Sequence, residues 1–290
     1  MKQIFFYLIT LLTLFTSIII TSCNEENEPI IPQEKSNFYI TEIHTTYPEL
    51  PSDYQLFEYD SINRISSYVY NIDGCLGNVN YTYLNKQNII LINTENTVLN
   101  TKTKTIYSDT LYLESGKVKE IHGLRDDKQR YDVLFSYNSN EELTKVEWVN
   151  YFSKNTIGKS QSHFNTYEWE NGNIKKIILQ DAYSNNHWKS MSLHYDNQIV
   201  TGKYDFHSCY NLQPQYRPLQ NYQLFGVLSQ NLPSIIYYNS SKSTAPENSS
   251  YKKFHYNYTE DYMLSIKAYY FSNDTCYSET LTTYKWKNNI

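Results

Sequence analysis

The sequence predicts an all-β protein, a large antiparallel up-and-down meander of hairpins that forms a curved open sheet or partial barrel. The composition favours strands, because 31 of the 290 residues are Tyr and only 8 are Gly. Tyr is common in strands, where its ring packs and its hydroxyl reaches water. A repeat also recurs, in which two aromatic residues one position apart precede polar turn residues and a new apolar run. Residues 131–137 alternate, with Tyr131, Val133 and Phe135 on one face and Asp132 and Leu134 on the other.

The chain begins with a segment typical of an export signal. A nearly continuous apolar run, residues 4–20, follows Lys2, and two small residues precede Cys23. About 17 apolar residues is the lower limit for a membrane-spanning helix, but small residues before a Cys favour cleavage. Ile20-Thr21-Ser22-Cys23 resembles the bacterial lipobox. This resemblance implies that residues 1–22 are a signal peptide and that Cys23 carries acyl chains such as palmitate, which anchor the protein in a membrane.

Residues 23–36 predict a flexible acidic tether, because their acids and prolines cannot build a core. Acidic residues directly after Cys23 resemble the export signal of surface-displayed lipoproteins in Bacteroidota, which implies lipid anchoring at the outer membrane and cell-surface exposure. The same composition also fits a generic polar spacer. Removal of residues 1–22 takes away Lys2 and no acid, so the net charge goes from −5 to −6. No basic block remains, and we expect no nucleic-acid partner.

Residues 37–290 are expected to form a single repetitive β-domain. Asn171-Gly172 is its clearest two-residue hairpin signal. The repeat occurs at residues 57–65, 135–143, 167–174, 193–199 and 254–262. It resembles a degenerate YD repeat of large bacterial shell proteins. The whole chain resembles more closely a group of Bacteroidales lipoproteins of unknown function that are described as having a porin-like fold. The resemblance brings no catalytic residue. Charged residues on both strand faces leave no continuous apolar belt for a bilayer.

Strand order predicts which connections share an end of the sheet. One end, the turn end, is expected to carry the tight turns 60–63, 85–87, 115–116, 138–141, 171–172 and 196–197. The other end, the loop end, is expected to carry the longer connections 73–78, 95–102, 124–129, 154–160 and 183–187, and the long excursion 207–233. Within the excursion, residues 219–228 fit one short helix as well as a strand. Loops on a rigid scaffold often carry function. We therefore expect ligand contacts at the loop end from Tyr151, Phe152, Tyr183 and Trp188.

Few residues indicate catalysis or metal binding. Asp205, His207 and Cys209 would share one strand face and suit a zinc ion, but a second ligand cluster is lacking, and a structural role is favoured. The sequence therefore predicts no enzyme, metal or cofactor. After lipidation of Cys23 three cysteines remain, so at most one internal disulfide can form. Cys75 and Cys209 share the loop end, which favours that pair.

Two triplets resemble the O-glycosylation signal of secreted Bacteroidota proteins. Asp60-Ser61-Ile62 places Ser61 in a predicted exposed turn. Asp109-Thr110-Leu111 places Thr110 inside a predicted strand.

The sequence supports two interpretations of function. The first is a non-catalytic, membrane-anchored surface lipoprotein with a binding or scaffold role, whose aromatic side chains stack on the sugar rings of a glycan or surface partner. The second is a periplasm-facing carrier or chaperone that cradles an acyl chain or an unfolded client on an uncovered apolar sheet face.

Overall fold

The computed structural model describes residues 38–126, 128–151, 159–181, 188–196, 212–241, 249–259 and 262–288. These residues form sixteen antiparallel strands and two short 3-10 helices. The strands are β1 (Phe38–Thr46), β2 (Asp53–Tyr59), β3 (Ile65–Ile72), β4 (Cys75–Leu84), β5 (Ile89–Val98), β6 (Thr103–Glu114), β7 (Lys117–Arg125), β8 (Arg130–Tyr137), β9 (Leu143–Tyr151), β10 (Lys159–Glu170), β11 (Asn173–Asp181), β12 (Trp188–His194), β13 (Ile235–Ser240), β14 (Ser250–Tyr258), β15 (Met263–Ser272) and β16 (Thr275–Asn288). The helices are η1 (Asn85–Gln87) and η2 (Pro214–Tyr222).

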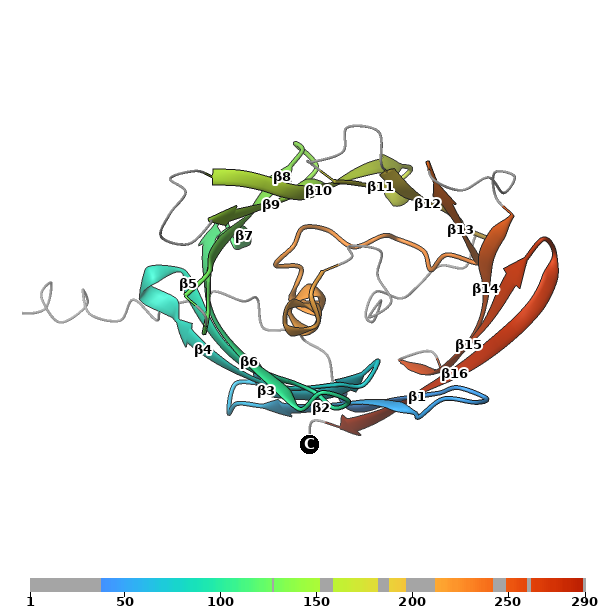
Figure 1. Ribbon diagram of the computed structural model, residues 1–290, viewed down its shortest axis with the longest axis horizontal. Helices are drawn as coiled ribbons and strands as arrows, with labels where there is room; N and C mark the ends of the chain where they lie inside the picture. The colour runs from blue at the N-terminus through green and yellow to red at the C-terminus, as the bar shows by residue number, and fades with distance from the viewer. Residues whose placement is uncertain are drawn as a thin grey trace, which may run out of the picture.

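The predicted meander is confirmed, but the sheet closes into a barrel and is not open. β1 pairs with β16 as well as with β2, and Ile43 lies opposite Tyr284 across the closing seam. Figure 1 shows the strands as a flattened ring around η2. An open sheet would leave the backbone N–H and C=O groups of its two edge strands unpaired. Pairing of β1 with β16 satisfies these groups, which favours the closed barrel.

The connections up to β12 lie at the ends that strand order predicts. The tight turns at 138–141 and 171–172 follow β8 and β10 at the turn end, whereas 124–129 joins β7 to β8 at the loop end. The expected separation of 124–129 from 171–172 by a strand length is confirmed. Two connections expected to be long are tight turns, because β3 and β4 are joined by Asp73-Gly74 and β5 and β6 by residues 99–102. Residues 152–158 and 182–187 lie outside the described part of the chain.

The aromatic repeat has a structural role at the turn end. In each repeat the first residue packs toward the interior, as Phe57 and Phe135 do, and the second donates a hydrogen bond to a backbone carbonyl of the preceding strand or its approach. These five bonds are 2.7–2.8 Å long and join Tyr59 to Ile40, Tyr137 to Val118, Trp169 to Leu143, Tyr195 to Ile174, and Tyr256 to Pro233. Outside the repeats, Tyr83 and Trp286 donate in the same way to Ile65 and Met263. They tie strand pairs together at the end where no turn joins them.

The barrel interior is mainly apolar, and the outer face mixes charged and polar side chains with exposed apolar ones such as Leu56, Leu134 and Leu281. Alternate residues such as Val79, Ile90, Leu111 and Val133 are almost fully buried in the interior, as strand periodicity requires. The outer face carries ion pairs at mid-strand, among them Lys285–Glu42 at 2.8 Å and Lys267–Glu279 at 3.0 Å, and Lys104–Glu95 at 2.8 Å lies nearer the loop end. A charge facing lipid at the bilayer midplane costs about 2–4 kcal/mol. These mid-strand charges favour water over acyl chains at the outer face.

Candidate functional site

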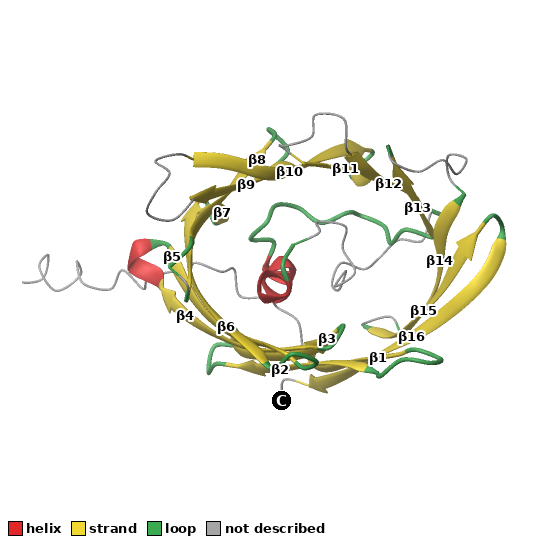
Figure 2. Ribbon diagram, viewed as in Figure 1, coloured by secondary structure: helices red, strands yellow, loops and turns green. Residues whose placement is uncertain are grey.

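A segment of the chain lies inside the barrel. This inserted segment, residues 212–234, is the part of the β12–β13 connection that leads into β13, and it contains η2. Figure 2 shows η2 within the ring of strands, followed by an extended stretch that runs below β10–β12 to β13. Pro214 opens η2 and Pro218 lies within it, and Gln223 ends it with a φ of 55°. Pro214 suits the first position of a helix, whereas Pro218 removes a backbone donor inside it, which disfavours a regular α-helix here.

The prediction that the long excursion leaves the sheet at the loop end is wrong. The connection leaves the barrel wall at the turn end, after β12. No strand separates β12 from β13 in the sheet, because Leu193 of β12 lies opposite Ile236 of β13. The predicted tight hairpin at 196–197 is therefore replaced by the long connection. The short helix expected near 219–228 exists, but it begins earlier, at Pro214.

The size of the barrel explains why the chain inserts a segment of its own. Eight strands enclose an interior that side chains can just fill, whereas sixteen enclose far more space. The inserted segment supplies apolar side chains to this space. Leu219, Leu224 and Phe225 are at most 1 % exposed, and the Phe225 ring lies 5.3 Å from that of Phe135 on β8.

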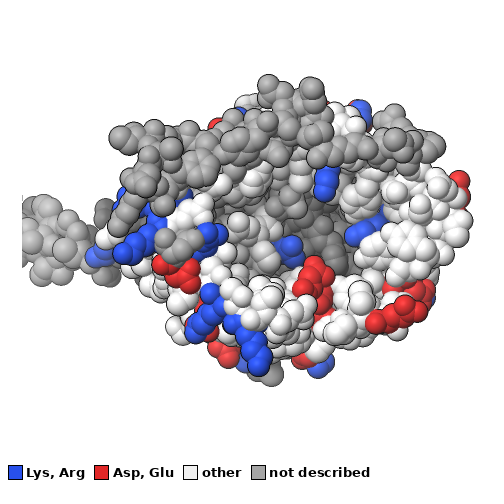
Figure 3. All heavy atoms as spheres, viewed as in Figure 1, with Lys and Arg blue, Asp and Glu red and all other residues white. Residues whose placement is uncertain are grey.

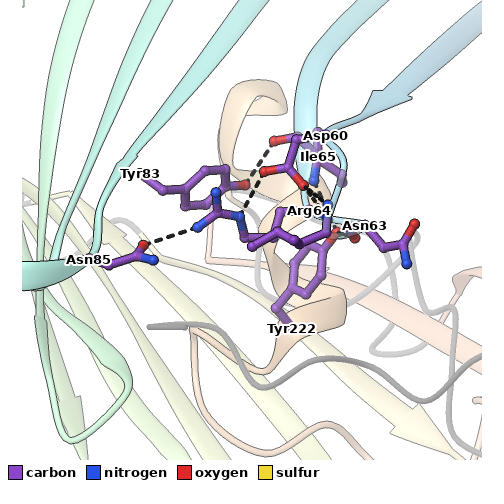
Figure 4. A network of polar contacts seen from close by, with 8 residues as sticks. Asp60, Asn63, Arg64, Ile65, Tyr83, Asn85 and Tyr222 are labelled. Atoms are coloured by element: carbon purple, nitrogen blue, oxygen red, sulfur yellow. Dashed lines mark hydrogen bonds and ion pairs between the residues drawn. The ribbon is translucent and has the colours of Figure 1, made fainter. Parts of the chain in front are cut away.

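Tyr222 attaches the end of η2 to the turn between β2 and β3. Its hydroxyl accepts a hydrogen bond from the amide of Ile65 at 3.1 Å and donates one to the carbonyl of Asn63 at 3.2 Å. The same turn is held by Arg64, which pairs with Asp60 at 2.8 Å (Figure 4). Arg64 also donates to Asn85 at 3.0 Å and stacks 4.2 Å from the centre of the Tyr83 ring. These contacts hold the β2–β3 turn in place, so Tyr222 binds the inserted segment to a rigid part of the wall.

Asp109 connects η2 to the wall on β6. Its carboxylate accepts hydrogen bonds from Tyr216 of η2, at 2.7 Å, and from Tyr131 of β8. Asp109 is 2 % exposed. Burial raises the pKa of its carboxyl above the ordinary value, and the two tyrosine hydroxyls partly oppose that rise. Nearby, the Tyr81 hydroxyl donates to the carbonyl of Gln215 at 2.7 Å. This buried network fixes the position of η2.

The extended part of the segment is bound to the turn-end hairpins through its backbone. The Val118 amide donates to Leu224, the Val227 amide to Glu141, and the Gln230 amide to Gly172, at 2.7–3.1 Å. Gly226 has a φ of +93°, and a Cβ at this position would lie 2.6 Å from the carbonyl oxygen of Glu141. Only glycine fits this close approach without strain.

A concave pocket lies at the turn end, over β10–β12. Its volume is about 680 Å³, and Glu168, Lys176, His194 and Asn231 are among its lining residues. Charges of both signs line it, and Lys175 already pairs with Glu170 at 3.0 Å. The barrel face seen in Figure 3 is also hollowed toward its centre.

The predicted ligand contacts at the loop end are only partly described. Tyr151 and Trp188 lie at that end on the outer face, and the Tyr151 hydroxyl binds the Asp132 carboxylate. Three strand spacings, about 14 Å, separate β9 from β12, so the structure does not bring the two rings together. Phe152 and Tyr183 lie outside the described residues.

The remaining predicted residues have mixed outcomes. Ser61 is exposed in the turn after β2, and Thr110 is half-buried in β6. Cys23 and the Asp205, His207 and Cys209 triplet lie outside the described residues. Cys75 is a free thiol, as is Cys276, so the favoured Cys75–Cys209 pair does not form.

Sequence reasoning missed the inserted segment and its contacts to Asp109. The two prolines of 214–218 and the Leu224-Phe225-Gly226 sequence were the available signals, since both interrupt the strand pattern. The described residues contain no cluster of three or more potential metal ligands. Within the same ranges, no helix has the length and apolar character to cross a membrane.

Comparison with solved structures places this architecture among known folds. A porin-like protein from Bacteroides uniformis superposes with a TM-score of 0.59 at 13% identity, covering 86% of this chain and 96% of that one. A porin-like protein from Bacteroides vulgatus gives 0.56 at 15% identity, covering 85% and 98%. The chain has a porin-like fold. No family model and no curated protein matches the sequence.

Proposed function

We propose that this chain is a non-catalytic, lipid-anchored binding protein of the outer membrane, exposed at the cell surface, that holds its ligand in the barrel interior. The polar outer face carries this proposal. Ion pairs such as Lys285–Glu42 at mid-strand suit water, so the barrel would project from the membrane on its lipidated Cys23 and the tether 23–36. The porin-like fold would then serve as a container, with the inserted segment as its internal wall.

The alternative function, a carrier that cradles an acyl chain or an unfolded client, needs an uncovered apolar interior. The deep interior of β15 and β16 is already covered. Ile266, Ala268 and Thr282 are at most 7 % exposed, so other parts of the protein already cover these side chains and a ligand could not contact them. A glycan or surface partner therefore remains the first ligand class to test, as the aromatic composition predicts.

Cell fractionation tests the anchor and the orientation of the barrel. The full chain is expressed with its own leader in a Bacteroidota host, and wild type is compared with Cys23→Ser. We expect wild type to need detergent for extraction and Cys23→Ser to be soluble after lysis, because only the lipid holds the protein. Protease treatment of intact cells should remove the wild-type protein. If Cys23→Ser withstands an alkaline carbonate wash in the membrane fraction, the barrel or residues 4–20 span the bilayer.

A further inference from the structure

Four side chains form a patch on the inner wall near the loop end. The basic-aromatic patch consists of Lys189 on β12, Tyr238 on β13, Lys252 on β14 and Tyr270 on β15. Lys252 lies directly opposite the interior residue Ile236 and also opposite Tyr270, and Tyr238 lies opposite Met191. All four therefore share the inward parity of the wall. Each lies within a few residues of the loop end of its strand.

The register places the two lysines on either side of one ring. Tyr238 is opposite Ser250, so Lys252 is its diagonal neighbour on β14, and Lys189 is its diagonal neighbour on β12. Diagonal neighbours lie about 7–8 Å apart. The ammonium of Lys252 lies 4.4 Å from the centre of the Tyr270 ring and 5.4 Å from that of Tyr238. Two aromatic rings and two cations thus alternate across four strands.

No carboxylate neutralises this patch within the described residues of β12–β16. The acids there are Asp196, Asp274 and Glu279. Asp274 accepts a hydrogen bond from Tyr251, and Glu279 pairs with Lys267 on the outer face. None of the ion pairs among the described residues includes Lys189 or Lys252. In a chain of net charge −5, two inward cations that take part in no ion pair among the described residues favour the approach of anions to the interior.

Burial restricts where a ligand can lie. Toward the turn end from the patch, Leu193, Ile236 and Ile266 are 4–6 % exposed, and Met191 and Phe254 are half-buried, so little apolar wall is uncovered there for a long apolar tail. The patch itself is open, because Lys189 is exposed and Lys252, Tyr238 and Tyr270 are half-buried. The accessible surface therefore offers ring faces for stacking and ammonium groups for charge-assisted hydrogen bonds.

We propose that this patch binds an acidic oligosaccharide, a chain of sugar rings that bears carboxylate or sulfate groups. The tyrosine rings stack on the apolar faces of the sugars, while Lys189 and Lys252 bind the anionic substituents. This inference rests on the proposed binding function and names its ligand class. A fatty acid also carries a negative charge, but its acyl chain would need an uncovered apolar surface. The protein itself covers most of the apolar wall.

Adjacent residues on the same strands provide matched controls. Lys253 and Tyr269 face outward, beside the inward-facing Lys252 and Tyr270, and Lys253 also lies over aromatic rings. Binding of tetragalacturonate to the detergent-solubilised, lipidated full chain is measured by calorimetry for wild type, Lys252→Gln and Lys253→Gln. We expect at least a tenfold loss of affinity for Lys252→Gln and less than a twofold change for Lys253→Gln. Tyr270→Ala and Tyr269→Ala form the second pair.

The ligand controls separate the ligand class from the binding function itself. Neutral tetragalactose should bind at least tenfold more weakly than tetragalacturonate, and raised salt should weaken only the acidic ligand. Equal losses for Lys252→Gln and Lys253→Gln, or equal binding of the neutral sugar, would overturn the proposal for the patch. Binding of decanoate or a neutral glycan without tetragalacturonate would overturn the ligand class and leave the binding function standing. Failure of every class of ligand would overturn both.

Discussion

Replacement of Phe225 by Ala should detach the inserted segment while the barrel stays folded. Phe225 is 1 % exposed and packs against Phe135 on the barrel wall. Removal of a buried Phe side chain costs about 3–5 kcal/mol. Among the described residues, the segment is held by its link to β13 and by its own contacts to the wall, so this loss should lower the free energy of its local opening. At about 1.4 kcal/mol per factor of ten, exchange of its protected amides should accelerate by roughly two to nearly four orders of magnitude.

Hydrogen–deuterium exchange measures this opening directly. The amides of Val227 and Gln223 report on the segment, because they donate to Glu141 and Gln220. Amides in the centre of β5 serve as a reference for the barrel and should change little. Leu134→Ala, at an outward position that is 38 % exposed, is the matched control and should leave the segment protected. If Phe225→Ala changes segment exchange by less than tenfold, or opens β5 equally, the segment is not a separate unit docked in the interior.

Two further changes test contacts of the same segment. Gly226→Ala should lower the free energy of urea unfolding more than Gly116→Ala does. Both positions have a positive φ, which costs an Ala about 1–2 kcal/mol, but the added Cβ would meet a carbonyl oxygen only at Gly226 and nothing within 4 Å at Gly116. Equal losses would contradict the close approach. Asp109→Asn should gain stability relative to wild type as the pH rises. The raised pKa of Asp109 means that the native state binds this proton more tightly than the unfolded chain does. The contribution of Asp109 to wild-type stability therefore falls as the pH climbs from below 3.8 through the raised pKa. Thermal melts at several pH values check this, and a constant difference between the two proteins would refute it.

Local patterns in the sequence predict most of the wall of this barrel. Alternation at Tyr131, Val133 and Phe135 assigns the inner face correctly, since side-chain direction depends only on strand periodicity. The hairpin at Asn171-Gly172 follows from turn chemistry, which is equally local. The aromatic repeat marks hairpins at four of its five positions and fails at Leu193, where β12 leads into the inserted segment.

Closure and the interior could not be predicted, because both depend on contacts distant in sequence. The seam joins Ile43 to Tyr284, and nothing near either residue specifies the other. Asp109 reads as an ordinary strand acid until Tyr216, 107 residues away, donates to it. The sequence also could not predict that Lys189 and Lys252 point inward. Whether Lys252 points into the barrel depends on which residues of β13 and β15 lie opposite it.

Labelling of one outward position tests most directly whether the barrel stands in water. Ser108 lies midway along β6, on the outer face opposite Asn93, and is exposed. Ser108→Cys is placed in a chain in which Cys75, Cys209 and Cys276 are Ser and Cys23 is kept, and the anchored protein is treated in intact membranes with a membrane-impermeant maleimide. We expect rapid labelling at the same rate with and without detergent. Protection in membranes that detergent removes would place this face in lipid and contradict the account.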